Sequence, residues 1–133
     1  MKRIAILVLL LSLLVVGCSR PGLVGKWSVN GKDDGNFLEF KSNGTWEYYE
    51  LRPRGWLIHT GTYTVDQNTL TIKDGKDRFE VKASENEPAS VKVSEEYVND
   101  RPTIAQFSIP AQDPNIVSIS GWMYGVPMMR RVK

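Results

Sequence analysis

The chain has 133 residues, of which 17 are basic and 15 acidic, so its net charge of +2 is close to neutral. A nearly balanced charge argues against general nucleic-acid binding, for which a basic domain is expected. The single cysteine excludes a disulfide within one chain, so the packing of apolar side chains must stabilise the fold.

Residues 1–17 have the pattern of a secretory signal peptide. Lys2 and Arg3 are followed by an apolar run over residues 4–16, which only Ser12 interrupts. A helix of this length reaches about 20 Å, which is short of the roughly 30 Å hydrocarbon core of a bilayer. We therefore expect a cleaved signal segment rather than a permanent membrane span.

The end of this segment, Leu14-Val15-Val16-Gly17-Cys18, resembles a bacterial lipobox. The resemblance implies cleavage after Gly17, a diacylglycerol thioether on Cys18 and an acyl chain such as palmitate on the new amine. Two or three such chains anchor a protein stably to a membrane. Ser19 is not the aspartate that resembles an inner-membrane retention signal, so in a Gram-negative host we expect the outer membrane. An ordinary secretory signal with an incidental cysteine is the alternative.

The expected organisation is a signal peptide at residues 1–17, a lipidated tether at residues 18–22 and one small domain at residues 23–133. Loss of Lys2 and Arg3 lowers the number of basic residues from 17 to 15, which equals the number of acidic residues. The tether reaches at most about 15 Å beyond the cysteine. We therefore expect the domain to stay close to the membrane surface.

From residue 23 onward, short runs of alternating apolar residues are separated by Gly, Asn, Asp and Pro. This pattern is typical of antiparallel sandwiches and barrels. We expect an all-β fold, a small antiparallel β-barrel of about eight to ten short strands. The expected strands cover residues 23–29, 37–41, 45–51, 56–65, 69–73, 78–82, 90–94, 103–109, 116–120 and 122–132.

The clearest hairpin turns at Ser42-Asn43-Gly44. With Gly44 in the left-handed conformation, Phe40 lies opposite Trp46, and Leu38 lies opposite Tyr48. Opposed residues share a face, so these four side chains form one apolar face of the hairpin.

Later strands give less regular patterns. The alternation slips near Thr60-Gly61, where we expect a bulge or a close backbone approach. Val91 and Val93 are expected to point inward. Residues 95–102 break the pattern and leave room for one helical turn, and the final strand over residues 122–132 is interrupted by a proline.

Several short motifs resemble those of lipocalins and related calycin barrels. The resemblance implies a barrel in which a late arginine packs over Trp27, and either Arg130 or Arg131 fits that role. The Thr-Asp-Tyr-type motif of full lipocalins is missing, which argues against a roomy ligand cavity. The motifs are Gly25-Lys26-Trp27, Gly44-Thr45-Trp46, Gly61-Thr62-Tyr63-Thr64-Val65 and Leu70-Thr71-Ile72.

Geometry also favours a filled barrel. Eight strands enclose a space just wide enough for the protein's own side chains or for one small ligand. The aromatic residues expected to fill it are Trp27, Phe40, Trp46, Tyr48, Tyr63, Phe79 and Phe107.

The sequence gives little support for a catalytic site or a metal site. His59 is the only histidine, and without a free cysteine it cannot build the usual zinc sites. Glu39 and Glu47 would face each other across the first hairpin, and we expect Lys41 or a neighbouring strand's cation to neutralise them rather than acid–base chemistry. No catalytic residue, metal or cofactor is predicted.

Tyr49 and Trp56 are the candidate contacts for a ligand or partner, because aromatic side chains near loops suit stacking. They could equally cap the end of the barrel. The sequence therefore predicts a membrane-anchored lipoprotein of the bacterial envelope with a non-catalytic binding or structural role. Its partners would be the membrane, through the lipid on Cys18, and an envelope protein or glycan. The alternative is a carrier of a small apolar ligand inside the barrel.

Overall fold

The computed structural model describes residues 22–94 and 101–133. The predicted signal peptide and Cys18 lie outside these residues. So does most of the segment 95–102, for which the sequence allows one helical turn. No helix long and apolar enough to cross a bilayer occurs between residues 22 and 94 or between residues 101 and 133.

The described chain forms ten β-strands and no helix, which confirms the predicted all-β fold. The strands are β1 (Gly25–Ser28), β2 (Phe37–Phe40), β3 (Thr45–Arg52), β4 (Gly55–Asp66), β5 (Thr69–Asp74), β6 (Arg78–Val81), β7 (Ser90–Val93), β8 (Thr103–Ser108), β9 (Ile116–Ser120) and β10 (Met129–Arg131).

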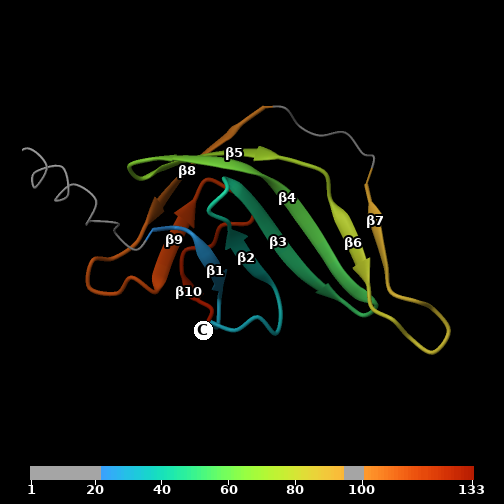
Figure 1. Cartoon of the computed structure of the whole chain (residues 1–133). Coiled ribbons are helices and arrows are strands. Elements are labelled where there is room, and N and C mark those ends of the chain that lie inside the picture. Colours follow the sequence, from blue (N-terminus) through green and yellow to red (C-terminus); the bar gives the residue numbers. More distant parts are fainter. Residues whose placement is uncertain (1–21, 95–100) are drawn as a thin grey trace, which may run out of the picture.

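Eight of these strands close into an antiparallel barrel, shown in Figure 1. Going round the barrel, β1 pairs with β2, then β3, β4, β5, β8, β9 and β10 follow, and β10 pairs with β1 again. Closure leaves no free sheet edge within the barrel, so every strand in it has two hydrogen-bonded neighbours.

The first predicted hairpin has the predicted register. Phe40 pairs with Trp46, and Leu38 pairs with Tyr48. Gly44 has a φ angle of +83°, which only glycine adopts without strain. The three-residue turn therefore sets which side chains of β2 and β3 point into the barrel.

The long strand β4 pairs with two strands along one edge and with a third along the other. Its first residues pair with β6 and its last residues pair with β5, while β3 lies along the other side. No bulge interrupts the pairing at Gly61, but the predicted close approach is confirmed. A Cβ atom on Gly61 would lie 2.0 Å from the carbonyl oxygen of Lys73 and 2.5 Å from Nε1 of Trp46.

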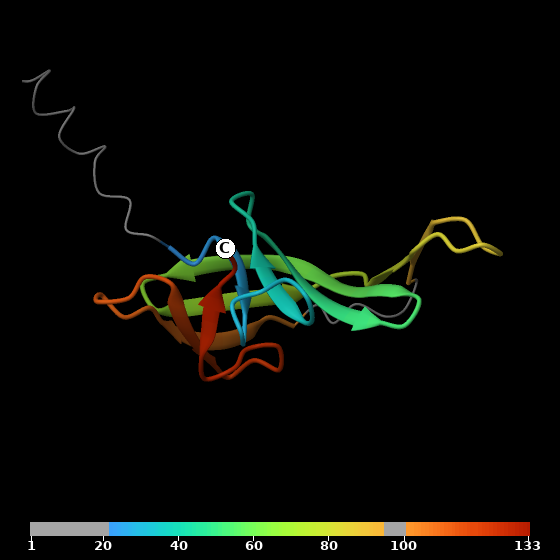
Figure 2. The ribbon, with the colours of Figure 1, turned by 90° about the horizontal axis from the view of Figure 1, so that it is seen from below.

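Strands β6 and β7 lie outside the barrel and extend it sideways (Figure 2). Together with the adjoining halves of β3 and β4 they form a flat extension that we call the arm. The predicted inward orientation of Val91 and Val93 is wrong, because they are 61% and 57% exposed. Phe79 was also expected inside the barrel, but it pairs with Leu57 in the arm.

The interior of the barrel is filled with apolar side chains, as predicted. Trp27, Phe40 and Trp46 are almost fully buried, and Tyr48, Tyr63 and Phe107 pack against them. The remaining buried members of this core are Leu23, Leu38, Leu70, Ile72, Ala105, Val117, Ile119, Trp122 and Met129.

The predicted final strand over residues 122–132 is wrong in its first half. Only β10 is a strand, and the chain before it forms a loop that folds back over one end of the barrel. The Trp122 ring makes an edge contact with Trp46 at 4.8 Å, and the Tyr124 ring stacks on Tyr48 at 4.7 Å. Burial of these two rings replaces the ladder pairing that the alternation predicts, and it closes this end of the barrel.

Gly61 gives a direct test of this packing. We expect Gly61→Ala to lower the free energy of unfolding by about 1–3 kcal/mol, because the new methyl group forces Trp46 and the Lys73 backbone apart. Gly35→Ala is the matched control, since a Cβ atom there meets nothing within 4 Å. Urea unfolding followed by tryptophan fluorescence measures both variants. Equal stabilities would contradict the close approach.

Candidate functional site

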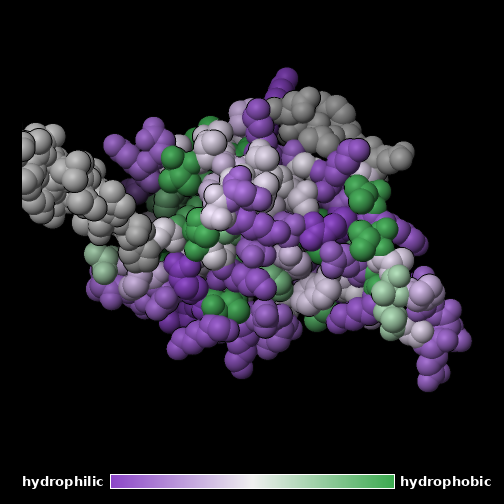
Figure 3. Space-filling view, in the orientation of Figure 1, coloured by the Kyte–Doolittle hydropathy of each residue, from purple (hydrophilic) through white to green (hydrophobic). Residues whose placement is uncertain are grey.

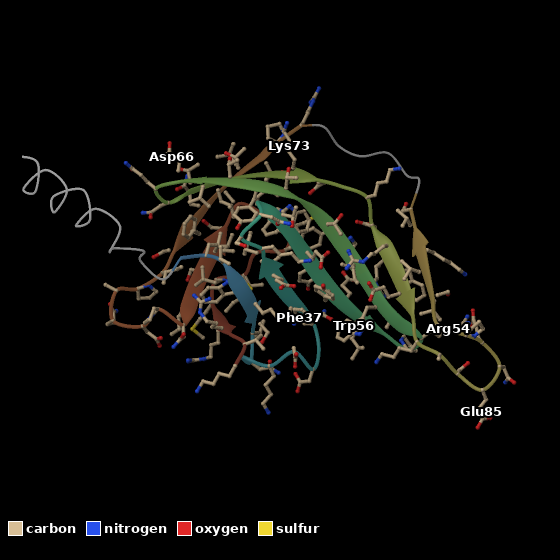
Figure 4. The ribbon with its side chains drawn as sticks, in the orientation of Figure 1. Phe37, Arg54, Trp56, Asp66, Lys73 and Glu85 are labelled. Atoms are coloured by element: carbon tan, nitrogen blue, oxygen red, sulfur yellow. The ribbon has the colours of Figure 1, made fainter. Side chains whose placement is uncertain are left out.

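One end of the barrel is hollowed into a pocket of about 880 Å³, which we call the mouth pocket. It lies where the described chain begins and where β4 turns into β5. Figure 4 places Asp66 of that turn at the opposite end of β4 from Arg54 and Trp56. Its lining residues are Gly22, Leu23, Val24, Ser42, Gly44, Tyr63, Thr64, Val65, Gln67, Asn68, Phe107, Ile109, Pro110, Ala111 and Pro114.

The lining of the mouth pocket is mainly apolar. Leu23, Tyr63, Phe107 and Ile109 belong to or pack against the barrel core, and Val65 is 45% exposed. None of the described residues that line the pocket carries a charge. A volume of this size with an apolar lining is typical of small-molecule sites. Hydrophobic residues are also visible at this end in the space-filling view (Figure 3).

Tyr63 fixes one wall of the pocket. Its hydroxyl donates a hydrogen bond of 2.7 Å to the carbonyl oxygen of Lys41, and its ring meets the edge of Phe40 at 5.0 Å. Burial raises the pKa of the phenol, so the donor stays protonated at neutral pH. The ring therefore separates the mouth pocket from the filled interior below it.

Arg131 holds the start of the described chain against the pocket. Its guanidinium donates hydrogen bonds to the carbonyl oxygens of Val24 at 2.8 Å, Gly22 at 3.1 Å and Pro114 at 3.4 Å. It also lies 4.2 Å from the centroid of the Trp27 ring. Of the two arginines that the lipocalin resemblance left open, the structure therefore assigns this contact to Arg131.

The opposite end of the barrel carries a polar cluster around His59. Nδ1 of His59 lies 2.9 Å from Asp77, and Nε2 lies 3.4 Å from Glu50. The ring stacks on Tyr124 at 5.0 Å. Burial and the nearby carboxylates of Asp77, Asp74 and Glu50 raise the pKa of Tyr124 to about 12. Both imidazole nitrogens face carboxylates. Through the stacking of Tyr124 on His59, the loop that contains Trp122 and Tyr124 contacts β4, and Glu50 adds a contact from β3.

Glu39 and Glu47 lie opposite each other, as predicted, and a neighbouring cation does neutralise Glu47. Arg78 of β6 contacts one Glu47 oxygen at 2.6 Å, and Lys41 contacts the other at 3.2 Å. The hydroxyl of Tyr49 also donates to Glu47. Burial alone would raise the pKa of Glu47, but these hydrogen bonds outweigh it and lower the pKa to about 2.

The predicted contact residues Tyr49 and Trp56 lie together, away from the mouth pocket. They form an aromatic cluster with Phe37, which stacks on Tyr49 at 4.3 Å and meets Trp56 at 5.7 Å. Lys82 lies over the Trp56 ring at 5.7 Å. Figure 4 shows Phe37 and Trp56 near each other. Both predicted residues are half-buried on the outward face, so they do not cap the mouth.

Sequence reasoning missed the residues of the mouth pocket. Phe107 and Ile109 were expected inside the barrel, and their position at its open end was not foreseen. Val65 was likewise expected to point inward. It lies near the end of β4, where it is 45% exposed and lines the pocket. The available signal was the apolar pair Leu23-Val24 directly after the expected tether.

Comparison of the chain with protein-family models, with curated proteins and with solved structures found no match. The family resemblance drawn from short motifs therefore receives no further support. The closed barrel and the contact between Trp27 and Arg131 are observations on this chain alone.

The Glu47 network predicts acid sensitivity. Because the pKa of Glu47 falls from 4.5 to about 2 on folding, its ionisation adds roughly 3 kcal/mol to stability above pH 4.5, and this is lost as the pH falls toward 2. We expect Glu47→Gln to unfold more easily at pH 7 and to lose most of this pH dependence. Urea unfolding at pH 7, 4.5 and 2.5 measures both effects.

Glu39→Gln is the control for this experiment, because Glu39 faces Glu47 across the hairpin but forms no ion pair among the described residues. Its acid unfolding should follow that of the wild-type protein. Equal pH profiles for Glu47→Gln and the wild type would show that the network does not contribute to stability.

Proposed function

We propose that this protein is a lipid-anchored lipoprotein of a bacterial cell envelope, with a non-catalytic binding role and the mouth pocket as its site for an apolar ligand. One observation carries the binding proposal. An uncharged, mainly apolar pocket of about 880 Å³ stays open at one end of a barrel whose interior and other end are filled. Such exposed concave apolar surface in a small domain is typical of ligand sites.

The anchoring part of the proposal rests on the sequence. The lipobox-like Leu14-Val15-Val16-Gly17-Cys18 predicts a thioether lipid on Cys18, and two or three acyl chains hold a protein firmly at a membrane. In a host with two membranes, Ser19 favours the outer one. The described domain begins four residues after Cys18, so a ligand would be bound close to the bilayer surface.

The proposal of a non-catalytic role is supported by the contacts of Glu47 and His59, the two residues that the sequence offered for acid–base or metal chemistry. Both oxygens of Glu47 are engaged by Arg78, Lys41 and Tyr49. Both ring nitrogens of His59 face carboxylates.

A second candidate function is recognition of an envelope protein or glycan through the aromatic cluster of Phe37, Tyr49 and Trp56. The specific observation in its favour is that three aromatic rings lie on the outward face, with Lys26 and Lys82 placed over two of them. Phe37 is only 6% exposed, so the half-buried rings of Tyr49 and Trp56 would make the contact by stacking on a sugar or a peptide.

The anchor is tested by the intact mass of the protein extracted from bacterial membranes. We expect a mature chain that starts at Cys18 and carries a diacylglycerol and an amide-linked acyl chain. Cys18→Ala should lack both additions, because no other residue supplies the thiol. An unlipidated wild-type protein would make Cys18 incidental, and a soluble secreted carrier would replace the anchored one.

The mouth pocket is tested with the uncharged apolar dye N-phenyl-1-naphthylamine, whose fluorescence rises in apolar sites. Val65→Trp should weaken dye binding at least tenfold, because the larger ring fills the pocket while its exposed position spares the core. Val93→Trp is the matched control on the exposed face of β7. Tyr49→Ala with Trp56→Ala should also leave dye binding unchanged. Loss of binding in that double variant alone would move the site to the aromatic cluster.

A further inference from the structure

We infer that the mouth pocket takes one acyl chain of a bilayer lipid directly from the membrane in which the protein is anchored. This inference rests on the proposed function and names both the ligand class and its route. It combines the position of the pocket, the fixed start of the domain and the chemistry of the pocket lining.

The position of the pocket puts it at the membrane side of the domain. Gly22, Leu23 and Val24 are the first described residues after the tether, and all three line the pocket. The β4–β5 turn and the loop after β8 complete the rim at the same end (Figure 1). Trp122 and Tyr124 close the other end, and the Phe40 ring lies between them and the pocket, 6.1 Å from Trp122 and 5.0 Å from Tyr63.

The start of the domain cannot swing away from the pocket. Arg131 donates to the carbonyl oxygens of Gly22 and Val24 on one side and of Pro114 on the other. The same guanidinium rests on Trp27, which is fully buried. The pocket rim and the attachment point of the tether are therefore parts of one rigid body.

The reach of the tether brings the pocket to the bilayer. Cys18 and Gly22 are four residues apart, and a fully extended chain spans at most about 14 Å over that distance. A lipid on Cys18 would therefore hold the pocket rim within the headgroup region or just outside it. Because Gly22 is itself a lining residue of the pocket, a lipid on Cys18 would keep this part of the rim at the bilayer surface.

The lining selects a hydrocarbon chain rather than a charged molecule. None of the described lining residues is charged, and the side chains of Phe107, Ile109 and Val65 offer an apolar surface. The polar groups of Ser42, Gln67 and Asn68 lie in the turns around it, where an ester or headgroup would remain wet. An acyl chain that moves from bilayer to pocket stays in an apolar environment, whereas a route through water would expose every methylene.

The experiment uses the full lipidated protein in vesicles of phosphatidylethanolamine and phosphatidylglycerol. A small fraction of the phospholipid carries a diazirine on one acyl chain, and ultraviolet light followed by peptide mass spectrometry locates the label. We expect labelling of the peptides that contain Val65, Phe107 and Ile109. Val65→Trp should lose this labelling at least tenfold, and Val93→Trp should keep it.

A lengthened tether separates the membrane route from binding itself. Insertion of twenty Gly and Ser residues between Pro21 and Gly22 should lower labelling from the bilayer roughly tenfold, because the effective concentration of the membrane falls steeply with tether length. Binding of N-phenyl-1-naphthylamine should not change. The same insert after Lys133 is the matched control and should keep full labelling.

The remaining outcomes overturn the inference in distinguishable ways. Dye binding without lipid labelling leaves the proposed function intact and refutes the acyl chain as ligand. Equal labelling with the long and short tethers refutes the membrane-facing route. If protein from cells fed a diazirine fatty acid forms a cross-link between the Cys18 peptide and a pocket peptide, the occupant is the protein's own anchor. Absence of both dye binding and labelling removes the mouth pocket as a site altogether.

Discussion

The contact between Arg131 and Trp27 joins β10 to β1, the last and the first strand of the barrel. Trp27 is fully buried, and its indole nitrogen donates to the carbonyl oxygen of Leu23 at 2.8 Å. The guanidinium over the ring adds about 1 kcal/mol of cation–π attraction, and its three hydrogen bonds fix the first described residues. Gly25 has a φ angle of +138°, which residues with a side chain rarely adopt, and a Cβ atom there would lie 2.4 Å from the guanidinium nitrogen Nη1. Trp27 and Arg131 are also Cα partners in the pairing of β1 with β10, which completes the barrel.

Closure leaves the two ends of the barrel chemically different. At one end Trp122 and Tyr124 fold over Trp46 and Tyr48, and carboxylates around His59 surround them. At the other end Tyr63 lines the mouth pocket, which no loop among residues 22–94 and 101–133 fills. A filled interior with one open end leaves that end as the place where the barrel itself can take a ligand, and the proposed lipid anchor lies at the same end.

The arm shows how one strand can belong to two structures. The twelve residues of β4 pair with β5 near the mouth and with β6 in the arm. The buried Glu47 of β3 forms ion pairs with Arg78 at the start of β6 and with Lys41 directly after β2, whose side chains are partly exposed. Breaking such a pair leaves an uncompensated buried charge, which is costly. The network therefore links β6 of the arm to β3 of the barrel.

Local chemistry in the sequence determined most of the strands and the first hairpin, in which Glu39 lies opposite Glu47. Alternation with period two and a glycine at the left-handed turn position decide these features within about fifteen residues. The tertiary structure alone decided that Val91, Val93 and Phe79 belong to the arm, that residues 122–128 close one end and that the other end stays open. The same alternation of apolar and polar residues occurs in the sequence whether the apolar face meets a barrel core, a neighbouring strand or solvent. Only the long-range pairing of β4, β6 and β10 distinguishes these cases, and no local pattern encodes it.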